Sequence, residues 1–294
     1  MKDPAIRSNR MQCLFALVSA GIVVIGVCIG VTMNLTTLYD ENFDHMGLQT
    51  FCMFTVNSNI LTALAMMLCI PYTVDGLRTG YYHLPDWVVI LMHMAITAIS
   101  LNFLISLCIL APVKGFYLIY SGSRFFLHGV CPILAILSFC CFICSHLVRL
   151  KESFLALIPV FIYAVIYFVM VVVIGEEKGG WNDFYGFATR LPIWIPATLL
   201  MPLTFGIATL LRLAHNSTCL ARRAKDAELY REAYGGADLR EAITAMARSR
   251  KKELKTKSLV IPSQVIGYMI ENSGSDLDPK EGCRLYFEVF IKES

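Results

Sequence analysis

The sequence predicts an all-α membrane protein, in which a six-transmembrane-helix bundle is followed by a small α(+β) tail at the C-terminus. Of its 294 residues, 56% are hydrophobic and only 16% are charged, whereas soluble domains carry about 25% charged residues. The charges are also uneven, because residues 1–212 hold only 11 of the 25 Lys and Arg and 10 of the 22 Asp and Glu. Residues 1–212 contain six uncharged apolar runs, each as long as the roughly 20 residues that cross a bilayer as a helix. We therefore divide the chain into a membrane domain, 1–212, and a soluble tail, 213–294.

The six apolar runs are the predicted membrane spans. The first follows Arg10 and exceeds the roughly 7–15 apolar residues of a signal peptide. Charged residues at 149–152 separate the fourth run from the fifth, and Arg212 ends the sixth. The predicted spans are residues 11–33, 48–72, 87–112, 125–148, 154–175 and 191–211. None of these runs contains Asp, Glu, Lys or Arg, which argues against a transporter, because ion-coupled carriers need ionisable groups at membrane depth.

Positive charge predicts the orientation of the bundle. Six spans put both termini on one side of the membrane. With the N-terminus inside, the inner segments up to Lys225 hold ten Lys and Arg, and the outer loops hold four. Because positive residues stay on the cytoplasmic side, we expect a multi-pass protein with both termini in the cytoplasm.

The tail combines helix-forming and strand-forming stretches. Residues 218–257 are rich in Ala, Arg and Glu and predict two helices broken at Gly235-Gly236. Residues 258–270 and 285–291 are β-branched and aromatic, which predicts a short hairpin or two strands. The basic run 248–257 fits a solvated helix face or a contact with anionic lipid headgroups. The tail's partner is not predicted.

Composition also limits the ligands. Nine of the eleven Cys lie within or beside the apolar runs, where Cys acts as a small hydrophobe. Cys141 and Cys144 have CxxC spacing but lie inside a span, so we predict no metal and no cofactor. The net charge of +3 does not suggest a nucleic acid as a partner.

The second span carries a polar stripe, around which we interpret the rest of the chain. Its members have helical spacing i, i+3, i+4, i+7 and lie on one face: Thr55, Ser58, Asn59 and Thr62. Polar side chains on a lipid-embedded helix face other helices or a wet cavity. The stripe therefore predicts the inner wall of a site.

Two further sets of residues could face this stripe. The fourth span has a seam at His128, Cys131, Ala135 and Ser138, and we expect it to lie opposite the stripe. The fifth span presents Tyr163 and Tyr167 on one face, which could line the same cavity. At about 1.5 Å per residue, Thr55 and His128 both fall in the outer half. The stripe His93, Thr97 and Ser100 of the third span is interpreted mainly as interhelical hydrogen bonding.

A hydroxyl beside an imidazole outlines a nucleophile and its base. In such a site Thr55 attacks a carbonyl, His128 takes the proton, and Asn59 or a backbone N–H holds the oxyanion. The alternative is structural, because Thr in a membrane helix often bonds its own i−4 carbonyl and Asn joins helices.

Two segments resemble a family of bacterial integral membrane proteins. The segment FTVNSNIL, residues 54–61, resembles that family's F-T-x-x-S-N-x-L, and FLHGVCPIL, residues 126–134, resembles its L-H-x-x-x-P-x-L. Tyr163, Tyr167 and the loop from Gly179 to Tyr185 are similar to its fifth helix and the loop that follows. This family is similar to the eukaryotic androgen-induced protein and androgen-dependent TFPI-regulating protein family, six-helix hydrolases of fatty-acid esters of hydroxy fatty acids that use an intramembrane Thr and His.

The resemblance covers about residues 10–212 and implies a function. It makes Thr55 the nucleophile and His128 its partner, with Ser58 as an alternative alignment for the hydroxyl. Ser58 or Asn59 would position the substrate or stabilise charge. The expected function is an intramembrane lipid-ester hydrolase of the bacterial cell membrane whose acyl-chain substrate enters from the outer leaflet. The alternatives are a non-catalytic lipid or ligand binder, a scaffold for the tail and, third, a transporter.

Overall fold

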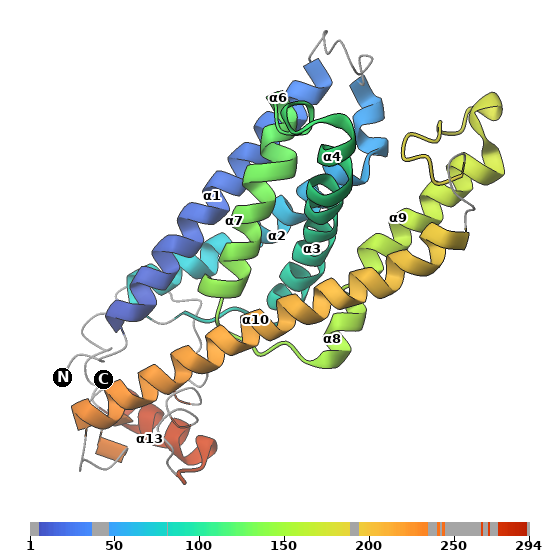
Figure 1. The fold of residues 1–294 in the computed structure, drawn as a ribbon. Helices are drawn as coiled ribbons and strands as arrows, with labels where there is room; N and C mark the ends of the chain where they lie inside the picture. Colours follow the sequence, from blue (N-terminus) through green and yellow to red (C-terminus); the bar gives the residue numbers. More distant parts are fainter. Residues whose placement is uncertain are drawn as a thin grey trace.

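The computed structural model describes residues 6–36, 47–80, 82–188, 194–234, 240–241, 243–244, 266, 270 and 276–292. Throughout these residues the regular structure is helical, and six helices are long and apolar enough to cross a membrane. They are Asn9–Thr36, Phe54–Thr79, Asp86–Lys114, Gly122–Phe142, Leu150–Ile174 and Thr198–Arg222. The prediction of a multi-pass helical membrane protein is therefore confirmed (Figure 1).

The first two spans set the two ends of the bundle. Helix α1 (Ile6–Thr36) packs along α2 (Phe54–Thr79), which a short 3-10 turn (Gly47–Cys52) precedes. We call the end at which α1 begins and α2 ends the terminal end, and the opposite end the distal end. The start of α1 and the last turns of α10 (Trp194–Tyr234) share the terminal end (Figure 1). Thr55, the second residue of α2, therefore lies at the distal end.

Helix α1 also packs closely against the fourth span. A Cβ at Gly26 would come within 2.8 Å of the Cys131 sulfur, and one at Gly30 would come within 2.8 Å of Leu127. Small residues at such crossings let two helices in lipid approach each other. This contact holds the His128 segment against α1.

Wider π-helical turns interrupt the third and fourth spans. The third span is built from α3 (Asp86–Ile105), a π-helical turn (Ser106–Leu110) and α4 (Ala111–Lys114). The fourth runs through α6 (Gly122–Arg124), a π-helical turn (Phe125–Val130), α7 (Cys131–Leu137) and another such turn (Ser138–Phe142). A fourth π-helical turn (Val169–Ile174) ends the fifth span. Each extra residue per turn rotates the side chains that follow onto a different face.

The third span is the centre of the bundle. Its most apolar window is 56% buried, against 11% for the fifth span, which is made of α8 (Leu150–Leu155), α9 (Ile158–Phe168) and the last π-helical turn. The short helix α5 (Phe116–Ile119) and a 3-10 turn (Glu176–Lys178) lie in connections between spans. The polar stripe of α3 does not make the expected interhelical hydrogen bonds within the described part of the chain. Thr97 bonds the His93 carbonyl of its own helix, and the ring nitrogens of His93 and the Ser100 hydroxyl are buried with no hydrogen-bond partner among the described residues.

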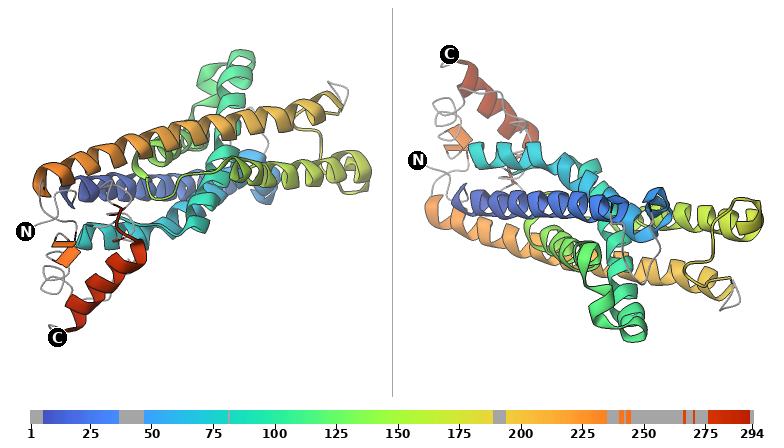
Figure 2. Two further views of the ribbon diagram at one scale, coloured as in Figure 1. Left: turned by 90° about the horizontal axis from the view of Figure 1, so that it is seen from below. Right: turned by 90° about the horizontal axis from the view of Figure 1, so that it is seen from above.

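The sixth span continues without a break into the tail. Helix α10 (Trp194–Tyr234) contains Pro202 and passes through Arg212, at which we had ended the membrane domain. Figure 2 shows α10 as one continuous rod. The predicted separate tail helix starting near 218 is thus the last part of α10.

The strand prediction for 285–291 is wrong, because these residues belong to helix α13 (Pro279–Lys292). Gly282 and Tyr286, one helical turn apart, are buried there, and a Cβ at Gly282 would meet Ile270, Ile266 and Ile243. Residues 266 and 270 are helical as well, and the rest of the predicted strand 258–270 lies outside the described residues.

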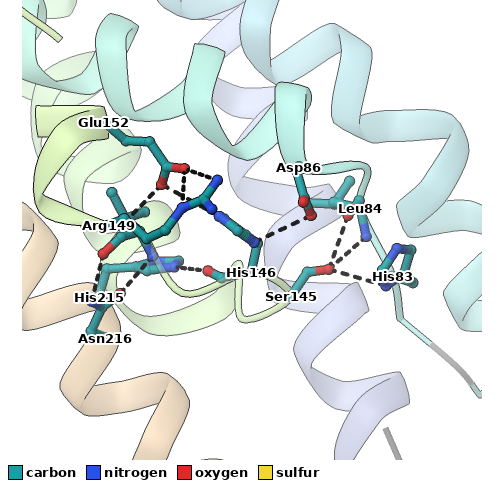
Figure 3. A network of polar contacts seen from close by, with 10 residues as sticks. His83, Leu84, Asp86, Ser145, His146, Arg149, Glu152, His215 and Asn216 are labelled. Atoms are coloured by element: carbon teal, nitrogen blue, oxygen red, sulfur yellow. Dashed lines mark hydrogen bonds and ion pairs between the residues drawn. The ribbon is translucent and has the colours of Figure 1, made fainter. Parts of the chain in front are cut away.

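A loop at the terminal end, residues 143–149, replaces the predicted end of the fourth span (Figure 3). Asn216 of α10 accepts a hydrogen bond from the Val148 N–H (2.9 Å) and donates one to the Val148 carbonyl (2.8 Å). Ser145 accepts a bond from the Leu84 N–H (2.8 Å). Burial lowers the pKa of the nearby His83, with Asp86 opposing the shift, so His83 is neutral at pH 7.

Glu152 is the buried anchor of this loop. Its carboxylate accepts bonds from the Arg149 N–H (2.7 Å) and the Arg149 side chain (2.8 Å), and it lies 3.4 Å from His146. His146 also lies 3.2 Å from Asp86. Glu152 is 2% exposed and lies on α8. Helix α8 therefore begins at Leu150, four residues before the predicted start of the fifth span, and it carries the charged residues Lys151 and Glu152.

We expect Glu152→Ala to lower the free energy of unfolding by about 1–3 kcal/mol, because it removes the buried acceptor of the Arg149 N–H and of the exposed Arg149 side chain. The control is Lys151→Ala, which changes an exposed side chain of the same helix. Thermal denaturation in detergent micelles measures both, and equal effects would show that the loop does not depend on Glu152.

Candidate functional site

Buried polar side chains of the second, third and fourth spans meet near the distal end. We call this set the distal polar layer: Thr55, Asn59, Asn102, Ser106 and His128. Asn59 and Ser106 are fully buried, and Asn102 and His128 are 5% and 8% exposed. The layer contains both residues that the sequence predicts to be reactive.

The backbone carbonyl of Leu127 is the acceptor that joins the layer. In the π-helical turn Phe125–Val130, the N–H of Cys131 bonds to the Phe126 carbonyl. In the same pattern, the Leu127 carbonyl would accept a bond from the N–H of residue 132, but Pro132 has no N–H. Proline in a membrane helix is tolerated where neighbouring helices satisfy the freed carbonyl.

Two amide side chains supply the missing donors. Asn59 of α2 donates to the Leu127 carbonyl at 2.9 Å and also to the Thr55 carbonyl at 2.7 Å. Asn102 of α3 donates to the same Leu127 carbonyl at 3.4 Å. This single backbone oxygen therefore ties three spans together.

Thr55 is bound to the third span. Its hydroxyl donates to Asn102 Oδ1 at 2.8 Å, which fixes the direction of the Asn102 amide. Ser58, the alternative hydroxyl, donates to the Thr55 carbonyl at 3.1 Å and is 2% exposed. Ser58 therefore has the backbone partner that is common for hydroxyls in membrane helices.

His128 is bound to another residue of the third span. Its Nδ1 lies 2.5 Å from the Ser106 hydroxyl oxygen. Ser106 follows Asn102 by four residues and therefore lies on the same helical face. The other ring nitrogen of His128, Nε2, has no hydrogen-bond partner among the described residues.

The structure brings Thr55 and His128 into one layer but does not pair them directly. Within the described chain, no hydrogen bond joins the two side chains, because Thr55 bonds Asn102 and His128 bonds Ser106. The two partners, Asn102 and Ser106, lie one turn apart on the same face of the third span.

The predicted seam of the fourth span divides between two neighbours. Cys131 lies 3.7 Å from the Val23 carbonyl and Ser138 accepts a 2.8 Å bond from Ser19, so both face α1. The expectation that the whole seam faces the second span is therefore wrong. The π-helical turns before Cys131 and at Ser138 change the face that a regular helix would present.

Three tyrosines cover the start of α2. The Tyr185 hydroxyl accepts a bond from the Phe54 N–H at 2.9 Å, which satisfies a free donor of the helix end. Tyr163 donates to the Cys52 carbonyl at 2.7 Å, and Tyr167 donates to Asp183 at 2.5 Å. Both predicted tyrosines thus lie at the distal end, beside the polar layer.

Tyr185 connects this cluster to Thr55. Burial raises the pKa of Tyr185, and hydrogen bonding by the Phe54 backbone and the Thr55 side chain opposes the shift. Tyr185 is therefore a neutral phenol beside Thr55.

Sequence reasoning missed Asn102 and Ser106. One signal could have found Asn102, because it is the only amide in the uncharged run 87–112. Ser106 then follows at i+4, on the same face.

The layer has the elements of acyl transfer: two hydroxyls, one imidazole and two amides. Among the described residues, no group of His, Cys, Asp and Glu could hold a metal ion. Comparison of the chain with protein-family models, curated proteins and solved structures finds no match.

A double-mutant cycle tests whether the Thr55–Asn102 contact contributes to stability. We expect Thr55→Val and Asn102→Ala each to lower the free energy of unfolding by about 1–2 kcal/mol, because each leaves a buried partner unsatisfied. Their effects should couple by about 1 kcal/mol, as neighbouring residues do.

The control is Asn57→Ala, which removes an exposed bond to the Phe51 carbonyl. Thermal melts in detergent give the free energies of unfolding of the wild type, the two single variants and the double variant, and of the control. Additive effects of Thr55→Val and Asn102→Ala would mean that the two side chains do not depend on each other.

Proposed function

We propose that the protein is an intramembrane lipid-ester hydrolase whose reactive centre is the distal polar layer. The observation that supports this most directly is the buried 2.5 Å contact between a hydroxyl, Ser106, and an imidazole, His128. A neutral imidazole in hydrogen-bond contact with a hydroxyl can act as a general base. The resemblance of residues 54–61 and 126–134 to a hydrolase-related family supports the same class of reaction.

His128 has the central role in this proposal. It takes the proton of an attacking hydroxyl and returns it to the alcohol that leaves the ester. The resemblance implies that the attacking hydroxyl is Thr55. For this, Thr55 must exchange its bond to Asn102 for one to His128 during the reaction.

The other predicted residues hold the site in shape. Asn59 donates to two backbone carbonyls, so its role is to join α2 to the fourth span. The Tyr163 ring lies tilted against Phe54 and against Tyr167, with 5.0 and 6.1 Å between ring centroids, and these rings form a wall beside Thr55. Such a wall suits the apolar part of an acyl ester.

The substrate reaches the layer from the membrane. We propose that both termini face the cytoplasm of a bacterial cell, as the positive charges indicate. The distal end then lies in the outer leaflet, and a membrane lipid or another acyl ester enters sideways.

We expect His128→Asn to reduce hydrolysis of a long-chain fluorogenic ester by about 10²–10⁴-fold, the usual contribution of a general base. The control is His83→Asn, which changes a histidine in the loop at the terminal end. The purified protein in detergent micelles is assayed for release of the fluorophore. Equal rates for the wild type and His128→Asn would exclude His128 as the base.

A non-catalytic function is the second candidate. The hydrogen bonds of Thr55, Asn59 and Asn102 favour it, because each of these side chains already bonds another group of the protein. In this case the layer only holds the helices together, and the bundle binds a lipid or carries the tail. A wild type that hydrolyses no ester, while Asn102→Ala still destabilises it, would support this candidate.

A further inference from the structure

We infer that Ser106, and not Thr55, is the nucleophile of the distal polar layer, and that Thr55 is a positioning residue. This inference rests on the proposed hydrolase function and assigns the roles within its site.

The acceptors of the two hydroxyls differ in chemistry. Thr55 donates its proton to the amide oxygen of Asn102, and an amide oxygen is not a base at neutral pH. The Ser106 hydroxyl contacts a ring nitrogen of His128, and this is the only hydrogen-bond partner of that hydroxyl among the described residues. Only the Ser106 hydroxyl is therefore in contact with a group that can remove its proton.

The backbone conformation also distinguishes Ser106 and His128 from the other residues of the layer. Ser106 opens the π-helical turn Ser106–Leu110, and His128 lies within the π-helical turn Phe125–Val130 of the neighbouring span. Such turns often occur at functional sites. The reactive side chains of two spans therefore meet where both helices are widened.

Asn102 is the donor for the oxyanion. Its amide nitrogen makes a long bond, 3.4 Å, to a Leu127 carbonyl that Asn59 already satisfies at 2.9 Å. The amide nitrogen carries two N–H groups and, within the described residues, makes only this long bond, so it can contact a substrate oxygen while Thr55 keeps the amide in place. Asn102 lies one turn before Ser106 on the same face of the third span. Thr55 holds the amide oxygen and so points the N–H into the layer.

Ser106 is buried, but its neighbours face the lipid. Ser106 is fully buried, while Leu107 and Ile109 are 37% and 56% exposed. An acyl chain in the bilayer can thus lie along the outside of this turn and present its ester to Ser106.

The reaction balances with water as the only co-reactant. His128 takes the Ser106 proton as Ser106 Oγ bonds to the ester carbonyl carbon, and the oxyanion accepts the Asn102 N–H. The ester C–O bond then breaks, and the alcohol leaves with the proton from His128. Water attacks the acyl-serine and gives its proton to His128, which returns it to Ser106 Oγ as the fatty acid leaves.

An alkyl fluorophosphonate, followed by peptide mass spectrometry, locates the nucleophile in the full-length protein. We expect the adduct on Ser106 in the wild type and in Thr55→Val, and no adduct in Ser106→Ala or His128→Asn. Ser106→Thr keeps a hydroxyl at this position and should retain a slower label at 106, which separates loss of the nucleophile from loss of folding.

The role of Thr55 is tested by rates. Thr55→Val should lower kcat by about 10- to 100-fold, as misplaced catalytic groups do, with little change in KM. Thr55→Ser keeps the hydroxyl that holds Asn102 and should restore kcat. A purely structural role would leave kcat per folded molecule unchanged in Thr55→Val and would change only its thermal stability.

The outcomes separate the two proposals. An adduct on Thr55 that persists in Ser106→Ala would overturn the assignment of Ser106 and leave the hydrolase function standing. A wild type that forms no adduct and hydrolyses no ester would overturn both.

Discussion

A backbone oxygen without a donor in its own helix is the constraint on which the bundle depends. In lipid, no water can satisfy the Leu127 carbonyl, and Pro132 removes the N–H that would do so. Two amides from other spans, Asn59 and Asn102, therefore point at the same atom. Their positions in turn fix Thr55 and the face of α3 that carries Ser106. The geometry of the site thus follows from one proline and one π-helical turn.

The membrane helices could be predicted from the sequence because hydropathy is a local property. All six spans are present, and their ends differ mainly where polar residues continue a helix, as at Glu152, or where the helix stops early, as at Phe142. The strand predicted at 285–291 failed for a related reason. Its aromatic content suits a strand, but Gly282 and Tyr286 bury one helical face.

The site could be predicted only in part. Thr55 and His128 were recognised because polar residues are conspicuous in apolar runs, and the structure brings both into one layer. Their partners could not be deduced, because helical spacing assumes 3.6 residues per turn. The π-helical turns break this assumption, so Cys131 and Ser138 face α1 while His128 faces Ser106. The roles of Asn102 and Ser106 as partners could not be predicted, because the sequence does not show that the third span is the centre of the bundle.

The unbroken course of α10 links the tail mechanically to the terminal end of the bundle. No hinge separates Arg212 from Tyr234, so a helix that carries the tail also carries His215 and Asn216. These two side chains hold the carbonyls of His146 and Val148. A torque applied to the tail is therefore transmitted along α10 as along a lever arm, first to α1 through the bond from Arg222 to Gln12 (2.8 Å) and then to the linker between the fourth and fifth spans.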